Sequence, residues 1–483
     1  MGERLAFGAG ALREIPNRAG GRGTDEPHAP ESAVLPPAAA ERRPRDWAFT
    51  GLLTFTALLF FRPQDTFPFL RHIPLADIAA LGALAAMVSS RLGRGLPVTR
   101  LTPELVGVLA LGAVILGTAP FSVWPGGVIG TFIGLFAKVL LIFVLMVNTL
   151  TSPRRIETFA WLIVVASGYI AGRAVFDYLR GVNLIEYGRV QGSLGGIFKN
   201  PNDLALNMVA LLPIAGLLLL QSTSWLRRGA AALCGVMMLG AIVASQSRSG
   251  TVGLVIMILV LAFYVVRRRP GIVAAAALAG VLVMPALPES YWHRIASITN
   301  KELDQTGSRE ARSILLRESW QAFLENPLTG VGAGQFAVYK PDERQEAWRE
   351  AHNVLLQVAA ELGIVGLLVF TFLIGRCVWA PMQMRRLVRQ LTPGRRRRGA
   401  YPRPLAEAER EQLTMQAAAL SASVLGWFAC ALFASVAYHW TFYYVLALAT
   451  APRDCLVARV AADRAVRSRA HADERRPPIG VPA

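Results

Sequence analysis

The segment AHNVLLQVAAELGIVGLLVFTFLIGR, residues 351–376, marks the point where a long polar loop becomes a hydrophobic helix. From residue 353 onward it is apolar and long enough to cross a bilayer, which takes about 20 residues. The segment before it, 288–352, is the longest polar stretch between hydrophobic blocks. A single histidine, His352, sits at the junction. We therefore expect the chemistry of this protein where the polar loop meets the helix.

Hydrophobic blocks of similar length recur along the chain. Of its 483 residues, 53% are hydrophobic and only 17% are charged, too few polar residues to cover a soluble domain. This pattern predicts an all-α, polytopic integral membrane protein with about twelve transmembrane helices. The blocks lie at 47–61, 74–90, 104–120, 127–149, 157–177, 203–220, 229–245, 250–266, 271–287, 353–376, 414–436 and 439–452.

The net charge of +18 lies mainly in short loops between the blocks. This bias is typical of cytoplasmic loops, so it predicts a cytoplasmic N-terminus and one large outer, periplasmic loop over 288–352. No interleaving of aromatic and basic residues accompanies the charge, which argues against a nucleic-acid partner. The basic groups are Arg91, Arg94 and Arg100; Arg154 and Arg155; Arg227 and Arg228; Arg267, Arg268 and Arg269; and Arg395 to Arg398.

Composition divides the chain into three parts. Residues 1–45 are rich in Gly, Ala, Pro and Arg, with no apolar periodicity and no signal-peptide core, so we expect a disordered N-terminal extension. A start codon placed too early is an alternative explanation of this segment. The transmembrane domain covers 46–452, and a disordered C-terminal tail is expected over 453–483. The four cysteines lack metal-ligand spacing, and no His/Cys cluster or carboxylate pair suggests a metal.

Several short motifs follow one another in a fixed order along the predicted outer connections. The chain resembles the O-antigen ligase and polymerase superfamily over roughly residues 47–450. The motifs that carry the resemblance are Phe61-Arg62-Pro63-Gln64, Phe198-x-Asn200-Pro201-Asn202, Ser247-Arg248-Ser249-Gly250, Asn326-Pro327-Leu328-x-Gly330-x-Gly332 and His352-Asn353-x-x-Leu355.

The resemblance implies a membrane glycosyltransferase with a GT-C-like helical fold, which works without a cofactor. Such an enzyme moves a glycan from undecaprenyl diphosphate to an acceptor at the outer face of the bacterial inner membrane. Its partners are the lipid-linked glycan, the acceptor and the bilayer. Three acceptors stay open: lipid A–core for a ligase, the growing polysaccharide for a polymerase, and a protein side chain for an O-oligosaccharyltransferase.

Arginines on the outer connections suit a lipid diphosphate. The planar guanidinium donates two parallel hydrogen bonds to phosphate oxygens, and a helix start adds backbone N–H groups. Arg189 and Arg248 lie on two different connections, and Arg248 begins a helix. Arg309 and Arg312 are three residues apart on a predicted helix and so share a face. The alternative is that these arginines are interfacial or solvated side chains.

His352 is the candidate base. A helix macrodipole disfavours the imidazolium at its N-terminus, which would keep the ring able to accept the proton of an attacking sugar hydroxyl. The resemblance leaves open whether this histidine acts as the base or orients the acceptor. Lys199 is a candidate phosphate contact. Asn200 and Asn202 flank Pro201, and they read either as binding residues or as a turn and helix cap.

A transporter is the rival hypothesis. It predicts paired charges near the midplane, broken helices and two similar halves. Lys138 and Glu361 lie inside apolar blocks and fit that pattern. However, the other candidates gather at the outer face, and the sequence shows no internal repeat.

Overall fold

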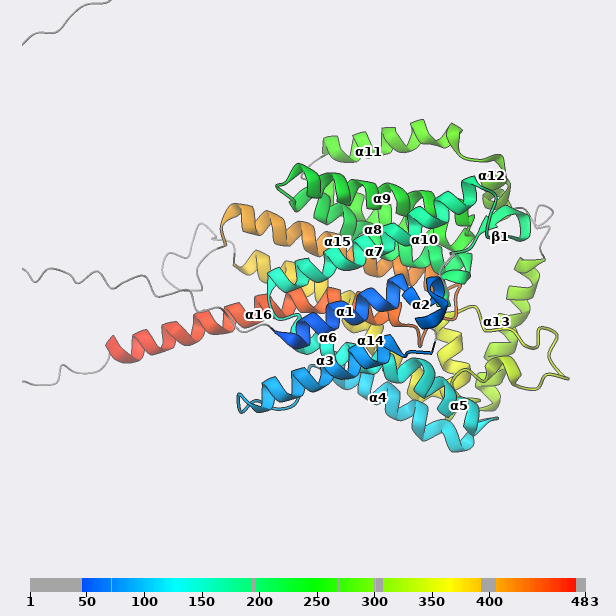
Figure 1. Ribbon diagram of the computed structural model, residues 1–483, viewed down its shortest axis with the longest axis horizontal. Coiled ribbons are helices and arrows are strands. Elements are labelled where there is room, and N and C mark those ends of the chain that lie inside the picture. The colour runs from blue at the N-terminus through cyan, green and yellow to red at the C-terminus, as the bar shows by residue number, and fades with distance from the viewer. Residues whose placement is uncertain are drawn as a thin grey trace, which may run out of the picture. The chain divides into compact units, whose positions relative to one another are not determined.

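The computed structural model describes residues 46–70, 72–192, 196–266, 270–298, 300, 307–391 and 405–474. The N-terminal extension expected over 1–45 lies outside these residues. Residues 46–474 form a bundle of long helices (Figure 1). The helices are α1 Trp47–Phe61, α2 Pro63–Thr66, α3 Leu75–Leu92, α4 Pro103–Thr118, α5 Pro125–Thr131, α6 Ala137–Thr149, α7 Pro153–Leu179, α8 Pro201–Gln221, α9 Trp225–Ser245, α10 Arg248–Val265, α11 Pro270–Val283, α12 Glu289–Ala296, α13 Ser308–Glu325, α14 Val354–Gln390, α15 Glu407–Ala431 and α16 Trp440–Glu474.

Smaller elements fill the connections. Strands β1 (Leu184–Ile185) and β2 (Arg189–Val190) pair antiparallel, with Ile185 opposite Arg189. A π-helical turn over Phe132–Phe136 joins α5 to α6. Single turns of 3₁₀-helix occur at Pro68–Leu70, Ala119–Phe121, Glu186–Gly188, Gly196–Lys199, Met284–Ala286 and Phe336–Val338.

The prediction of an all-α membrane protein is confirmed. Among the described residues, nine helical segments are long and apolar enough to cross a membrane. They comprise α3, α4, α5 with α6, α7, α8, α9, α10, α14 and α15. The other three predicted spans correspond to α1, α11 and α16. With 15 and 14 residues, α1 and α11 reach only about 22 Å, short of a core about 30 Å thick. The count of twelve spans therefore stays a prediction.

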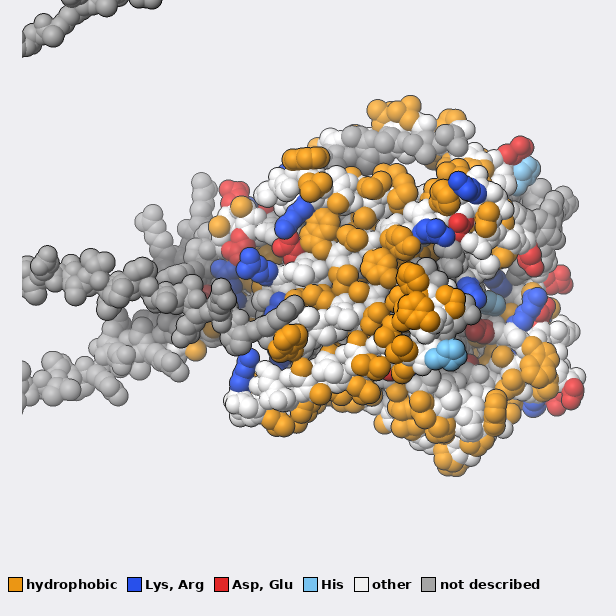
Figure 2. Space-filling view, in the orientation of Figure 1, with side chains coloured by type: hydrophobic (Ala, Val, Ile, Leu, Met, Phe, Trp, Pro, Cys, Tyr) orange, Lys and Arg blue, Asp and Glu red, His pale blue; other side chains and the backbone are white. Residues whose placement is uncertain are grey.

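Hydrophobic side chains cover the helices, whereas charged side chains gather toward the two ends of the bundle (Figure 2). The most enclosed span is α8, which packs against α9, α10 and α15 and has 72% of its apolar window buried. The connections at α2, β1, α12 and α13 all lie at one end (Figure 1). Folding thus brings together the segments that the sequence analysis assigned to the outer face.

The tenth predicted span is a broken helix. Within α14, Gly363 has φ 65° and ψ −164°, so the helix stops and restarts there. A turn of the outer loop packs against this break. The Ile364 N–H donates to the Pro327 carbonyl oxygen in that turn at 2.8 Å. A Cβ on Gly363 would lie 2.5 Å from the carbonyl group of Leu328, so only glycine fits. The outer loop is therefore anchored inside the bundle.

The two charges that fit the transporter hypothesis, Glu361 and Lys138, both have partners. The Gly334 N–H, in the same outer turn, donates to Glu361 Oε2 at 2.9 Å. Lys138 forms an ion pair with Asp77 at 3.0 Å, which joins α6 to α3. Each partner lowers the cost of placing a charge within the helices.

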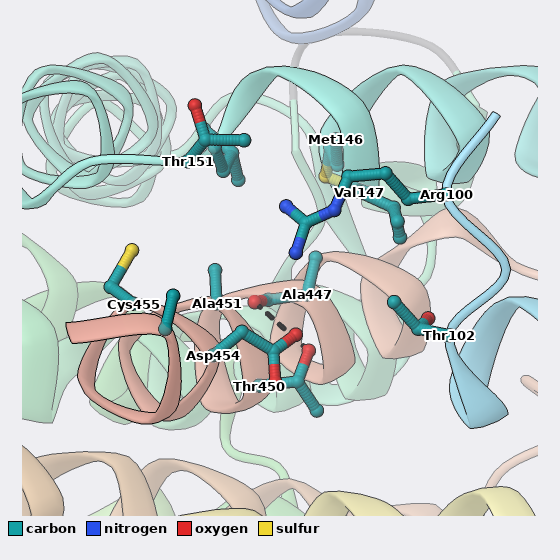
Figure 3. Close-up of a pocket in the computed structure, with 12 residues that line it drawn as sticks. Arg100, Thr102, Met146, Val147, Thr151, Ala447, Thr450, Ala451, Asp454 and Cys455 are labelled. Carbon is teal, nitrogen blue, oxygen red and sulfur yellow. Dashed lines mark hydrogen bonds between the residues drawn. The ribbon is translucent and has the colours of Figure 1, made fainter. Parts of the chain in front are cut away.

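The C-terminal helix is longer than expected. We predicted a disordered tail from residue 453, but α16 continues to Glu474, so this expectation is wrong for 453–474. The physical reason is tertiary: Arg453 Nη1 donates to buried Glu104 at 3.0 Å. Beside it, Arg100 and Asp454 face a cavity of only about 40 Å³, room for a water molecule (Figure 3). Residues 475–483 lie outside the described part of the chain.

Candidate functional site

Arg189 links two outer connections. It lies on β2 and is buried, with 8% of its surface exposed. Its Nε donates to the carbonyl oxygen of Ser245, at the end of α9, at 3.2 Å. Its Nη2 donates to Oδ1 of Asn202, in the first turn of α8, at 3.0 Å. These bonds fix the guanidinium in one orientation.

Asn202 and Asn200 have different roles. The Asn202 Oδ1 that accepts from Arg189 also accepts from Ser247 Oγ at 2.8 Å, and Ser247 caps α10 by accepting from the Gly250 N–H. Asn202 thus ties together the connections that carry Arg189 and Arg248. Asn200 is the N-cap of α8 and accepts from the Asn202 N–H at 2.9 Å. A structural role is therefore visible for both residues.

Four arginines from separate segments meet near β2. Burial, and then the neighbouring Arg294, Arg312 and Arg248 guanidinium groups, lower the pKa of Arg189 to about 10. We call these four residues the arginine cluster. Arg309, by contrast, is exposed and donates to the Ile298 carbonyl oxygen at 3.4 Å.

Arg294 is not among the arginines that the sequence pointed to. It lies on α12, and two hydrogen bonds hold α12 against the start of α10. Gln246 Nε2 donates to Ser290 Oγ, and the Tyr291 and Thr251 hydroxyls share a bond, each at 3.1 Å. The only signal in the sequence was that Arg294 belongs to the outer loop, which also holds two lysines and several other arginines.

His352 is held by its backbone. It precedes Asn353, the N-cap of α14, and has φ 50° in the left-handed region. Its N–H donates to Ser435 Oγ at 2.9 Å. A non-glycine residue in this conformation carries strain of the kind that clusters at functional sites. The side chain is thus fixed at the mouth of the helix, close to where the sequence predicted it.

The surroundings of His352 favour the neutral imidazole. Burial, with a further contribution from Arg312 and Arg349, lowers the pKa of His352 to about 4. We attributed this effect to the helix macrodipole, but burial is the main cause. Because Arg312 acts on both Arg189 and His352, the histidine lies beside the arginine cluster.

A cavity of about 750 Å³ opens next to His352. Apolar side chains of α1 and α6 line one part of it, and polar side chains from the ends of helices line another. None of the four cluster arginines lines it. Its polar lining includes Lys199, Asn200, Asp203, Glu350, His352 and His439.

Three of these residues escaped the sequence analysis. Asp203 directly follows Asn202, and Glu350 lies two residues before His352, so their positions beside motif residues were a usable signal. Nothing in the sequence around His439 connects it to the others. Burial lowers the pKa of His439 to about 4. Within the described ranges, no group of three or more His, Cys, Asp or Glu residues could hold a metal ion.

The helices and this polar site together define a multi-pass membrane protein with its candidate chemistry at one end of the bundle. Residues 233–371 match the family described as O-Antigen ligase. This match supports the resemblance to the O-antigen ligase superfamily that the motifs indicate. The match includes Arg248, Arg312 and His352. It begins at residue 233, so Arg189 and Asn202 lie before it. No curated protein matches the chain.

The matched family indicates a membrane enzyme of the O-antigen ligase or polymerase type. It favours an enzyme over the transporter that the sequence left open. Its substrates are expected among glycans and lipid-linked glycans, and the bilayer is its environment.

Proposed function

We propose that this protein transfers a glycan from undecaprenyl diphosphate to an acceptor hydroxyl at the outer face of the bacterial inner membrane, on a GT-C-like scaffold. The observation that carries the proposal is that Arg312 acts on both His352 and Arg189, which links the histidine to the arginine cluster. Cations suited to a diphosphate and a neutral imidazole suited to a proton thus occur in one site.

The arginine cluster supports the leaving group. When the acceptor oxygen bonds to the anomeric carbon, the bond from that carbon to the diphosphate oxygen breaks, and the electron pair leaves with the diphosphate. Guanidinium groups fixed in advance stabilise this charge without reorganising. Arg189 fits best, because Asn202 and Ser245 already orient it. Arg248, Arg312 and Arg294 add charge, whereas exposed Arg309 is better suited to initial capture.

His352 takes the proton of the acceptor hydroxyl in this mechanism. In the ligand-free site, burial and the nearby arginines keep the pKa of His352 low, which leaves the ring neutral but weakly basic. A diphosphate bound to the cluster offsets the charge of Arg312, so His352 becomes a stronger base once the donor is in place. Donor binding thus raises the basicity of His352, and without the donor His352 is too weak a base to deprotonate water.

The test uses the purified protein in nanodiscs with an undecaprenyl-diphosphate-linked glycan and the cell's own acceptor lipids and glycans. His352→Ala should abolish transfer yet bind the donor nearly as the wild type does. Arg248→Ala should lose both donor binding and transfer, and Arg248→Lys should recover only a small part because it lacks the bidentate fork. We expect wild-type activity to survive EDTA. Transfer at the wild-type rate by the His352 variant would refute the assignment of the base.

A further inference from the structure

Two carboxyl groups in the cavity beside His352 form no ion pair among the described residues. Asp203 lies in the first turn of α8 and Glu350 in the outer loop, and each lines the cavity. Across the described part of the chain, neither carboxylate has a hydrogen-bond donor or an ion-pair partner. Glu350 keeps a surface open to the cavity, yet enough protein encloses it that burial raises the pKa of its carboxyl.

The basic residues of the cavity do not neutralise these carboxylates. Lys199 forms no ion pair with either of them among the described contacts. The other basic lining residues pair elsewhere, as Arg62–Asp65 at 2.6 Å, Lys138–Asp77 at 3.0 Å and Arg349–Glu346 at 2.9 Å. Basic side chains therefore line the same cavity, but none of the ion pairs they form includes Asp203 or Glu350.

A third polar group in the cavity also lacks a partner. His439 lines the cavity, and its Nδ1 atom is buried without a hydrogen-bond partner in the described residues. Its loop is held to the start of α14, because the Ala437 N–H donates to Gln357 Oε1 at 3.2 Å. The same loop supplies the Ser435 hydroxyl that fixes His352. Both histidines are thus positioned by one junction.

An enclosed polar group without a partner is costly, and a carboxylate can only accept hydrogen bonds. The ligand that offers several donors at once and no charge is a sugar. Trp440, which also lines the cavity, offers an apolar surface of the kind that sugar rings pack against. The volume of about 750 Å³ lies within the range of roughly 300–1,000 Å³ of small-molecule sites.

We propose that this cavity is the acceptor subsite, that its occupant is a sugar, and that Asp203 and Glu350 accept hydrogen bonds from its hydroxyl groups. The assignment of this cavity to the acceptor substrate rests on the proposed function. The arginine cluster, which suits a diphosphate, lies outside the cavity lining. His352 is adjacent to both sites, as the residue that takes a proton from one substrate while the other departs should be. A sugar acceptor also excludes the protein side chain among the three acceptors.

The test measures binding of sugars separately from transfer. The probes are oligosaccharides released by mild acid from the organism's own lipopolysaccharide core and surface polysaccharide, titrated into the full chain in nanodiscs and followed by saturation-transfer NMR. Wild-type protein should bind at least one of them. Asp203→Asn and Glu350→Gln should each weaken that binding about tenfold, as expected for one lost charge-assisted hydrogen bond. Asp342→Asn, on an exposed part of the same outer loop, is the matched control and should bind normally.

A second probe, undecaprenyl diphosphate without sugar, separates the two substrates. Arg248→Ala should lose this lipid and keep the oligosaccharide, and the two carboxylate variants should do the reverse. Oligosaccharide binding that survives both carboxylate variants, or that no wild-type titration detects, overturns the proposal. If Arg248→Ala loses oligosaccharide binding and the carboxylate variants keep it, the sugar binds at the donor site. That result also overturns the proposal. If carboxylate-dependent binding is present but no transfer occurs, the subsite stands and the proposed function fails.

Discussion

Asn202→Ala removes the one side-chain oxygen that joins Arg189 to Ser247. The lost bond from Arg189, 3.0 Å long, is charge-assisted and worth about 1.5–3 kcal/mol. The 2.8 Å bond from Ser247 is neutral and worth about 1 kcal/mol. If the energy of the first bond serves to orient Arg189 for the diphosphate, donor affinity should fall about 10- to 150-fold, since each 1.4 kcal/mol is a factor of ten.

Asn200→Ala is the matched control, two residues away in the same motif. It removes only the cap of α8, a 2.9 Å bond, at a cost of about 0.5–2 kcal/mol in helix stability. It should lower the thermal unfolding temperature slightly and leave donor affinity unchanged. Asn202→Asp should lower donor affinity and leave the unfolding temperature unchanged, because a carboxylate would keep Arg189 in place but cancel its charge.

Both quantities can be measured on protein in nanodiscs, with affinity for undecaprenyl diphosphate from native mass spectrometry and stability from thermal unfolding. Undiminished affinity in Asn202→Ala would refute the view that this asparagine orients Arg189. An equal loss in Asn200→Ala would mean that Asn200 binds the donor directly, as the sequence analysis allowed.

Three further outcomes follow from the structure. The pKa of His352 is lowered to about 4, so its ring should stay neutral as pH falls from 8 to 5 and gain a proton only near 4; histidine-labelled NMR would contradict this if the resonance titrated near 6.5. Gly363→Ala should abolish recovery of folded protein, because strain of about 1–3 kcal/mol adds to a 2.5 Å clash, whereas Gly375→Ala, in open space on the same helix, should purify normally. Glu104→Gln should cost about 3–5 kcal/mol, seen as a lower unfolding temperature, because it removes the buried carboxylate that pairs with both Arg376 and buried Arg453; a comparable loss in exposed Glu157→Gln would argue against that cause.

The sequence predicted the helices well because crossing a bilayer imposes length and apolarity on each segment separately. The start of α10 is an example: the sequence predicts that Arg248 begins a helix, and it does. The break in α14 could not be predicted in this way. Residues 353–376 read as one continuous apolar block, and Gly363 departs from helical geometry because the turn at Pro327 and Leu328 occupies the space beside it.

The site was predicted in parts and not as a whole. Asn202 and Arg248 were recognised in separate motifs and Arg189 as an arginine on an outer connection, but no spacing in the sequence says that Asn202 holds Arg189. Asp203 and His439 are more than 200 residues apart, and only the packing of the helix ends brings them to one cavity. Partners that meet through tertiary structure leave no periodic signal along the chain.

The crowding of guanidinium groups around Arg189 also bears on how the protein can be handled. Repulsion within the arginine cluster is relieved whenever an anion occupies it, and an anion that binds only the folded protein stabilises it by RT ln(1 + [L]/Kd), about 2.7 kcal/mol at a hundred times Kd. Inorganic pyrophosphate has the needed charge and carries no glycan. It should therefore raise the melting temperature of the detergent-solubilised protein while competing with the lipid donor. The empty enzyme would then be its most fragile form, and buffers containing pyrophosphate would suit purification and storage.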